Sequence, residues 1–199
     1  MKKILVIKGH PRDICFCNQL VDQYIEGAKK EYAEVKVLNI HELQLEPWLK
    51  YDWDRNHDSI PFSDDLKQAQ ELIKWSDHIM IAYPTYWAGP PAIVKLFIEV
   101  IVTSGFAFKY YQPLWGIIPR WHRLLKGRTA TIISTMDAPP IFMNVVDRDP
   151  GGKMMFDVLS FVGIKLKHKY YFGSVILRVK KMHDVWLKKA FRAGENDAR

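Results

Sequence analysis

The sequence has few cysteines, and its most inviting loop lacks the usual glycine fingerprints. Cys15 and Cys17 are the two cysteines in 199 residues, too few for a disulfide framework, and a bridge across one intervening residue would be strained. We therefore expect reduced thiols and a cytoplasmic location. The segment KGHPRDICFCN, residues 8–18, contains neither G-x-G-x-x-G nor G-x-x-x-x-G-K-[ST], so it is neither a Rossmann nor a P-loop phosphate loop.

Long apolar runs are also missing. The most apolar stretch, residues 90–102, carries Lys95 and Glu99 and is shorter than the roughly 20 residues that a membrane span needs. We interpret it as a buried helix and expect no integral membrane segment. The first residues run into a short apolar stretch that ends at Lys8, which is too short for an export signal, so we expect no export by this route.

The net charge of +7 is concentrated at one end of the sequence. Residues 164–199 hold ten basic and three acidic side chains, and the preceding residues hold 19 of each. Because no nucleic-acid motif accompanies this basic region, we interpret it as a solvated face and expect no nucleic-acid partner. The helix RVKKMHDVWLKKAFR leaves a second interpretation open, in which its apolar side docks on an acidic membrane or partner instead of packing on the sheet.

Apolar periodicity predicts alternating strands and helices, and hence an α/β fold with one parallel sheet covered on both faces. The expected strands span 3–8, 35–40, 79–83, 128–135 and 165–172, and the expected helices 17–32, 64–75, 89–102, 153–162 and 179–191. Residues 41–61 are polar and aromatic without a period. Lysines at 165, 167 and 169 alternate with other residues, which suits an edge strand. We predict a single domain over 1–193 and a frayed tail over 194–199.

In open α/β sheets, ligands bind beyond the carboxyl ends of the strands, so the loops at 9–17, 83–89 and 135–150 are the candidate site. The first loop leads into a helix whose free N–H groups can hold an anion. YPTYWAGPP and SGFAFKYYQPLW supply aromatic rings for a flat ligand, although such rings also occur in cores and subunit interfaces.

Other chemistries find less support in these loops. A phosphate-accepting receiver domain needs an aspartate after the third strand, where this sequence has Tyr83 and Pro84. Cys15 and His10 could form a nucleophile–base pair, but nothing supplies the third, orienting group. His10, Cys15 and Cys17 lack the spacing of a tetrahedral zinc site, and we expect no metal.

Several motifs, in order, carry a family resemblance. GHPRDICFCNQL, YPTYWAGPPAIVKLFIEVIVTSGFAF, STMDAPPIFM and LSFVGIK are similar to segments of the flavodoxin-like NAD(P)H:quinone oxidoreductases, a group that includes quinone reductases, drug-activity modulator reductases and azoreductases. The second motif is the specific one. The resemblance implies a doubly wound five-stranded parallel sheet of order 2-1-3-4-5. It also implies an NAD(P)H dehydrogenase (quinone)-type flavoenzyme, with the site completed by a second subunit of a homodimer.

The resemblance also implies a cofactor and a set of contacts. The cofactor is FMN, with FAD as the alternative, and NAD(P)H is the electron donor in a ping-pong reaction that reduces a quinone or a similar acceptor. The cofactor supplies the hard chemistry. The implied phosphate contacts are His10, Cys15, Phe16 and Cys17; the implied ring contacts are Pro84, Thr85, Tyr86 and Trp87, with Thr135, Met136 and Asp137 at the other edge.

The sequence departs from the family pattern at important positions. Cys15 stands where serine or threonine is usual, which replaces a strong hydrogen bond to phosphate with a weak S–H donor. Phe142 and Arg148 are the nearest positions to a tyrosine and a histidine that assist hydride transfer in some relatives. Arg148 could stabilise an anionic flavin or hydroquinone. Two alternatives remain, a flavodoxin-like electron carrier and a regulatory or interaction protein with weak or lost flavin binding.

Overall fold

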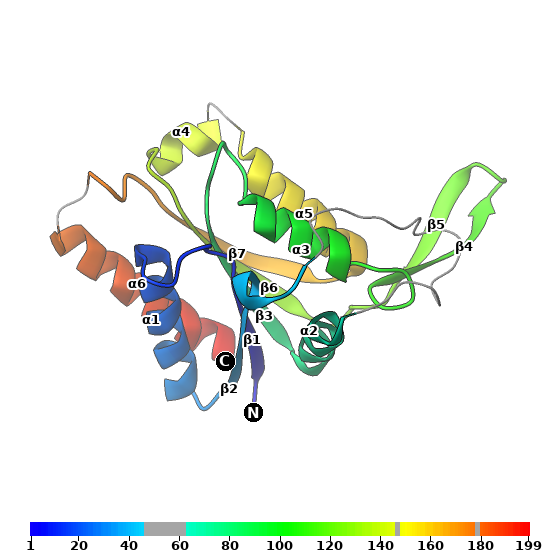
Figure 1. Ribbon diagram of the computed structural model, residues 1–199, viewed down its shortest axis with the longest axis horizontal. Coiled ribbons are helices and arrows are strands. Elements are labelled where there is room, and N and C mark those ends of the chain that lie inside the picture. The colour runs from blue at the N-terminus through cyan, green and yellow to red at the C-terminus, as the bar shows by residue number, and fades with distance from the viewer. Residues whose placement is uncertain (46–62, 146–147, 178–179) are drawn as a thin grey trace.

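A five-stranded parallel sheet forms the centre of the molecule. The computed structural model describes residues 1–45, 63–145, 148–177 and 180–199 (Figure 1). The strands are β1 (Lys3–Lys8), β2 (Glu34–Asn39), β3 (His78–Pro84), β6 (Thr129–Thr135) and β7 (Lys165–Phe172). Their order is β2-β1-β3-β6-β7, and all neighbours pair in parallel. This confirms the predicted sheet, its order and the edge position of the lysine-bearing strand.

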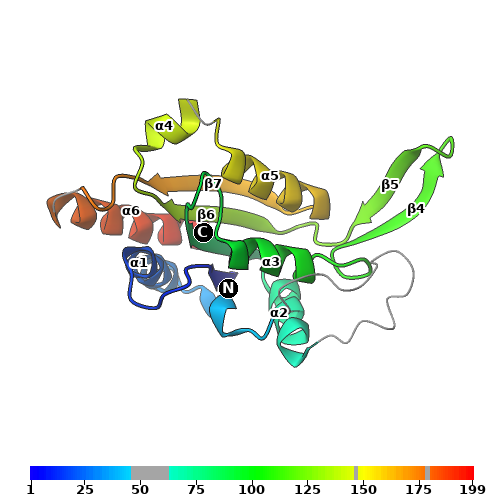
Figure 2. The same ribbon diagram turned by 45° about the horizontal axis from the view of Figure 1, so that its top comes forward.

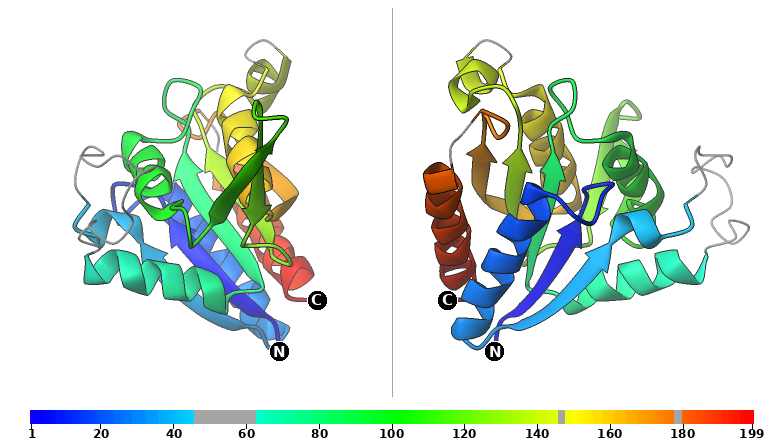
Figure 3. Two further views of the ribbon diagram at one scale, coloured as in Figure 1. Left: turned by 90° about the vertical axis from the view of Figure 1, so that its right-hand side faces the viewer. Right: turned by 60° about the vertical axis from the view of Figure 1, so that its left-hand side comes forward.

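Helices cover both faces of the sheet. Helices α1 (Phe16–Lys30) and α6 (Lys180–Ala198) lie side by side on one face, and α2 (Asp64–Trp75), α3 (Ala92–Ile101) and α5 (Pro150–Val162) pack on the other (Figures 1 and 3). Most of residues 41–61, which showed no period, lie outside the described residues, and so does Val179, the expected start of the last helix.

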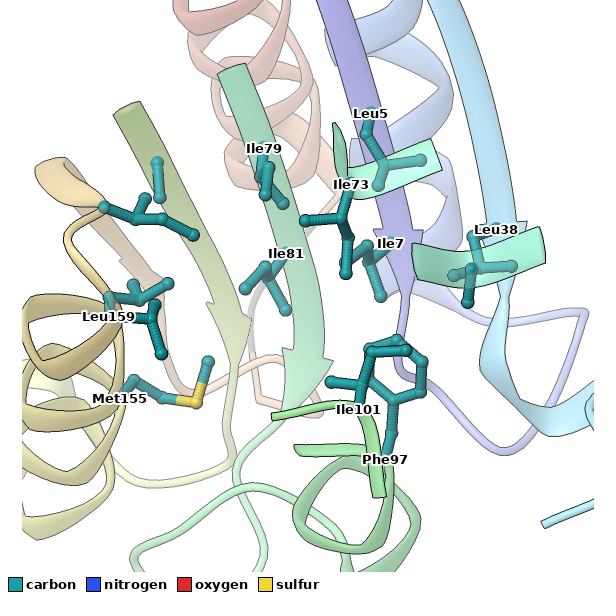
Figure 4. Packing of buried hydrophobic residues seen from close by; sticks show 14 of the residues in the cluster. Leu5, Ile7, Leu38, Ile73, Ile79, Ile81, Phe97, Ile101, Met155 and Leu159 are labelled. Atoms are coloured by element: carbon teal, nitrogen blue, oxygen red, sulfur yellow. The ribbon is translucent and has the colours of Figure 1, made fainter. Parts of the chain in front are cut away.

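Alternate side chains of the central strands point to opposite faces of the sheet and pack in two separate hydrophobic clusters. Leu5 and Ile7 of β1 join the cluster under α2, α3 and α5 (Figure 4). Ile4 and Val6 join the cluster under α1 and α6. Because burying one such aliphatic side chain contributes about 1.5–3 kcal/mol, the two faces together hold the central strands in register.

The last residues correct one expectation. The tail predicted to fray from Gly194 is helical, because α6 continues to Ala198, and Gly194 and Asp197 are buried. A Cβ atom on Gly27 would overlap the carbonyl oxygen of Phe191, and one on Gly194 would overlap that of Tyr24, so the two helices pack backbone against backbone. The spacing of the apolar residues did not reveal this contact, because it depends on glycines rather than on apolar side chains.

The segment after α3 forms a feature that the sequence did not predict. Strands β4 (Phe108–Leu114) and β5 (Ile118–Arg123) form an antiparallel hairpin that extends away from the sheet (Figure 2). At its base, the Trp121 ring stacks on Phe161, and its Nε1–H donates to the Phe161 carbonyl oxygen at 2.9 Å. The other unpredicted elements are helix α4 (Pro140–Val145) and the 3₁₀ turn η1 (Ile40–Glu42). Within the described residues, no helix has the length and apolarity to cross a membrane.

Candidate functional site

The loops that follow the sheet strands meet at one pocket. The loops after β1, β3 and β6 lie at the same end of the sheet, as parallel strands require, and residues after β7 close the side (Figure 3). The pocket has a volume of about 330 Å³, within the usual range for small-molecule sites. Its lining consists of His10, Arg12, Ile14, Cys15, Phe16, Cys17, Pro84, Thr85, Tyr86, Thr135, Met136, Asp137, Val175 and Ile176.

The structure therefore brings together ten of the eleven residues predicted to contact a cofactor. Trp87 is the exception, because its side chain is fully exposed beside the pocket lining rather than in it. Sequence reasoning missed Arg12 and Ile14, which lie between predicted residues of the first loop. It also missed Val175 and Ile176, because the loop after the fifth strand was not considered; its position beyond a carboxyl strand end was the signal that could have found it.

Gly9 fixes the course of the first loop through close packing. Its N–H donates to the Ala82 carbonyl oxygen at 2.7 Å. A Cβ atom at Gly9 would lie 2.6 Å from Val94 Cγ2 and 2.9 Å from that same carbonyl oxygen. Glycine is thus needed here to let the loop cross β3 and α3, and the loop reaches the pocket without a glycine fingerprint.

His10 is buried at the pocket and lies behind the turn that leads to α1. Its Nδ1 lies 3.0 Å from the Arg12 backbone nitrogen and 3.1 Å from the Arg12 carbonyl oxygen. When Nδ1 accepts from the Arg12 N–H, the neutral ring carries its proton on Nε2; the other tautomer donates from Nδ1 to the carbonyl oxygen. Burial lowers the pKa of His10 by more than the hydrogen bond with the Arg12 backbone raises it. The ring is therefore a neutral hydrogen-bond donor at neutral pH.

Cys15 caps helix α1. It has an extended conformation, and its Sγ accepts from the Asn18 N–H at 3.4 Å and donates to the Arg12 carbonyl oxygen at 3.5 Å. Burial raises the pKa of the Cys15 thiol, which keeps it protonated and able to donate. A thiol is a weaker acceptor than the hydroxyl of serine, the usual residue at an N-cap, so this helix start is held by weak bonds.

Cys17 is a core residue rather than a reactive one. It is buried in the cluster between the sheet and the helices α1 and α6, at the border of the pocket, and burial raises its pKa to about 12. Such a thiol is neither a nucleophile nor a ready metal ligand. In the part of the chain that the structure describes, no three metal-ligating side chains gather at one point.

The loop after β3 contains a tight turn with a strained backbone. Tyr86 and Gly89 exchange two backbone hydrogen bonds, at 2.8 and 3.1 Å. The two residues between them, Trp87 and Ala88, both have left-handed backbones, with φ of 50° and 62°. Non-glycine residues in this region cost of order 1–3 kcal/mol each and persist where the surroundings hold them, typically at functional sites.

The loop after β6 is tied to both of its neighbours. The Thr85 N–H donates to the Thr135 carbonyl oxygen at 2.7 Å, and the hydroxyls of Thr85 and Ser134 lie 2.7 Å apart. On the other side, the Met136 N–H donates to Phe172, and the Val175 N–H donates back to Met136. The pocket thus has a floor of hydrogen-bonded backbone and an exposed carboxylate, Asp137, at its edge.

Two predicted groups lie elsewhere. Phe142, on α4, is half-exposed, and Arg148 is exposed with a left-handed backbone; neither belongs to the pocket lining found among the described residues. The aromatic side chains of the hairpin also lie outside this lining. Because Tyr110, Trp115 and other hairpin side chains are exposed, they are available to another molecule.

The chain resembles known proteins over most of its length. A protein of Haemophilus influenzae named Uncharacterized NAD(P)H oxidoreductase is 27% identical over 106 residues, 53% of this chain and 52% of that protein. The chain thus spans about half the length of the first curated relatives that it matches. Escherichia coli YcaK, also named Uncharacterized NAD(P)H oxidoreductase, is 21% identical and covers 92% of this chain and 97% of its own length.

A solved structure and a family match complete the comparison. The FMN-dependent NADH-azoreductase of Bacillus anthracis, solved in complex with FMN, superimposes with a TM-score of 0.76, 16% identity and full coverage of both chains, which supports the same fold. The family described as Flavodoxin-like fold matches residues 2–184. The match confirms the family resemblance that the sequence motifs predicted. The chain therefore belongs to this flavodoxin-like family.

Proposed function

We propose that this protein is a flavin-dependent NAD(P)H oxidoreductase that binds FMN in the pocket described above and reduces quinones or similar acceptors in a ping-pong reaction. The observation that carries the proposal is the convergence of ten predicted contact residues, from three separate loops, on one pocket at the start of α1. The relatives named as NAD(P)H oxidoreductases and the azoreductase solved with FMN support the same conclusion.

The residues at the start of α1 suit a phosphate. The first N–H groups of a helix have no acceptor within it, and the helix dipole attracts an anion there. His10 can add a donor from Nε2, and Arg12 is exposed at the same wall and can add a positive charge. We propose that these groups, rather than a glycine-rich loop, hold the single phosphate of FMN.

The opposite part of the pocket suits a flat ring. Pro84, Thr85 and Tyr86 line one side, and Thr135, Met136 and Asp137 line the other. When bound there, the flavin would supply the two-electron redox chemistry that links NAD(P)H oxidation to reduction of the acceptor. The chain's task is to bind, orient and shield the ring, because the described pocket contains no activated nucleophile.

We further propose that the working form is a homodimer whose second copy covers the open side of the pocket. Ile14, which lines the pocket, and Trp87, next to Tyr86 of the lining, are almost fully exposed, and such exposed apolar side chains are typical of interaction sites. Phe142 and Arg148 stay predictions for charge stabilisation, to be tested in the dimer. The cytoplasmic location also stays a prediction.

A direct test uses the purified full chain, with FMN added during purification. We expect a yellow protein that absorbs near 450 nm, loses this absorbance with NADPH or NADH, and regains it when a quinone is added. Anaerobic stopped-flow experiments would separate the two half-reactions. A colourless protein that takes up neither FMN nor FAD would overturn the proposal and favour the alternative, a regulatory or interaction protein on this fold with weak or lost flavin binding.

A further inference from the structure

The strained turn at the pocket is held from an unexpected side, by the start of α5. The Gly151 N–H donates to the Ala88 carbonyl oxygen at 3.0 Å. A Cβ atom on Gly151 would lie 2.8 Å from the same oxygen and 2.9 Å from Gly89 Cα, so only glycine allows this approach. The turn at residues 86–89 therefore rests directly on the first residues of α5.

Asp149 organises that helix start. It has a left-handed backbone, with φ of 50°, and its Oδ1 accepts from the Gly152 N–H at 3.0 Å as the N-cap of α5. Its Oδ2 accepts from the Tyr171 hydroxyl at 2.7 Å and from Lys169. The carboxylate thus joins the last strand of the sheet to the helix start, and its own N–H donates to the Met143 carbonyl oxygen at 2.9 Å.

The environment of this carboxylate holds it in place. The helix N-terminus and Lys169 lie against its oxygens. A Cβ atom on Gly152 would overlap both the carboxylate and the Tyr171 hydroxyl, so a second glycine is needed to admit them. Burial, and then the hydrogen bond to Asp149, raise the pKa of Tyr171 far above its usual range, which keeps its hydroxyl a donor.

From these contacts we infer that Asp149 is a positioning residue for the flavin pocket: through the Asp149–Gly152 helix start, it holds the Tyr86–Gly89 turn in its left-handed form. The left-handed residues on both sides of the Gly151–Ala88 hydrogen bond require such support, because this backbone form persists only where several contacts determine it. Tyr86, which lines the pocket, and Trp87, exposed beside it, are then presented to the ring in one orientation. The effect of Asp149 on flavin binding rests on the proposed function, whereas its support of the Tyr86–Gly89 turn does not.

The first experiment follows backbone amide exchange in the protein without added flavin. The reporters are the N–H groups of Tyr86 and Gly89, which bond within the turn, and that of Gly151. In Asp149→Ala, we expect these three amides to exchange about tenfold faster or more, while amides of β1 and β3 keep their protection. Asp149→Asn should restore most of the protection, because asparagine accepts from the same N–H and tolerates a left-handed backbone.

Matched variants separate the turn from the rest of α5. Asp157→Ala removes an exposed carboxylate from the same helix and should leave all three amides unchanged. Gly151→Ala pushes on the turn directly and should reproduce the fast exchange with Asp149 intact. If amides throughout the chain exchange faster in Asp149→Ala, the variant is destabilised as a whole, and Tyr171→Phe and Gly151→Ala are measured instead. Unchanged protection of the Tyr86 and Gly89 amides in both of these variants would overturn the inference.

The second experiment links the contact to the pocket. In Asp149→Ala, we expect FMN to bind about tenfold more weakly and the spectrum of the bound flavin to shift, with both restored in Asp149→Asn. If the wild-type chain binds no flavin, the proposed function fails, and the exchange experiment still decides the positioning role. If flavin binding and its spectrum stay unchanged while the turn loosens, the role of Asp149 in the pocket is overturned.

Discussion

The two ends of helix α1 are held in opposite ways. At its C-terminal end, Gly27 meets the backbone of α6 directly, and ion pairs join Lys30 to Glu195 and Glu31 to Arg199. At its N-terminal end, a thiol provides the cap, and the first N–H groups face a pocket. One end has little room for change, whereas the other keeps its hydrogen-bonding capacity for a ligand.

A buried polar cluster adds to the tight end. Asp197, near the C-terminus, accepts from the Tyr24 hydroxyl at 2.9 Å, and its carboxylate lies 3.2 Å from His78 Nε2. All three side chains are nearly or fully buried. The left-handed backbones of Trp87 and Ala88 lie instead at the pocket end. The comparison indicates that the stabilising contacts are concentrated away from the pocket. The strained backbone at the pocket can then be tolerated, because the rest of the fold offsets its cost.

The largest expected effect comes from Asp197→Ala. It leaves the Tyr24 hydroxyl and His78 without their buried partner, and breaking a buried pair typically costs about 3–5 kcal/mol. Urea unfolding should show this loss, while the dissociation constant for FMN should stay within about twofold, because distant sites act independently. Asp184→Ala, on the exposed side of the same helix, is the control. If Asp197→Ala weakened flavin binding and left stability unchanged, the assignment of stability to this end of α1 and of ligand binding to the other would be wrong.

For the same variant, we expect the loss of stability to depend on pH. Burial alone would raise the pKa of Asp197, but His78, Thr131 and the Tyr24 hydroxyl outweigh burial and lower it. A carboxyl group with a lowered folded pKa stabilises the fold above its ordinary value of 3.8, and this contribution is lost as the pH falls through the folded pKa. The stability difference between the wild type and Asp197→Ala should therefore be constant near neutral pH and shrink in acid.

The next largest effect is expected for Gly27→Ala. The added methyl group would overlap the Phe191 carbonyl oxygen, so α1 and α6 must separate, at a cost of about 2–3 kcal/mol. Gly89→Ala is the matched control, because the nearest heavy atom to its Cβ lies 4.0 Å away, and its stability should change by less than about 1 kcal/mol. Equal losses in the two variants would show that helix contact is not the cause.

The sequence predicted the sheet well because the central strands β1, β3 and β6 are short apolar runs that must be buried, and the alternating lysines of β7 mark an edge strand. It did not predict the helix contact at Gly27 and Gly194, since two glycines far apart in the chain carry no periodic signal. The hairpin was missed for a related reason. Strands β4 and β5 pair with each other, and their side chains are almost all exposed, so no apolar face marks them.

The site was predictable to the extent that sheet topology determines it. Strand ends fix which loops meet, and the motif resemblance selected His10 and Tyr86 within them. The support that Asp149 gives to the Tyr86–Gly89 turn was not predictable. Asp149 joins the start of α5 to β7, and no residue pattern predicts its left-handed backbone. The motif resemblance predicted Trp87 as a pocket residue, because a motif indicates which residues lie near a site but not the direction in which each side chain points.

At the pocket end, His10→Asn should weaken FMN binding about tenfold, since a hydrogen bond to a charged group contributes about 1.5–3 kcal/mol. A phosphate beside the ring favours protonation of His10, whose pKa is lowered by burial in the free protein. Binding then takes up a proton, so the advantage of the wild type over His10→Asn should grow as the pH falls from 8 to about 5. Titrations across this range would measure it, with exposed His122→Asn as the control. Parallel pH profiles for wild type and His10→Asn would place the phosphate elsewhere.

The smallest effect, and the sharpest test of the weak helix start, is expected for Cys15→Ser. A hydroxyl caps a helix better than a thiol, so the variant should be more stable by up to about 1 kcal/mol and should retain FMN several-fold more tightly. Ser63, which caps α2 away from the pocket by accepting from the Leu66 N–H at 3.3 Å, offers the inverse control. Ser63→Cys should lose a similar amount of stability and leave FMN binding unchanged. If Cys15→Ser gains stability without tighter FMN retention, the start of α1 is an ordinary helix end, and the phosphate does not bind there.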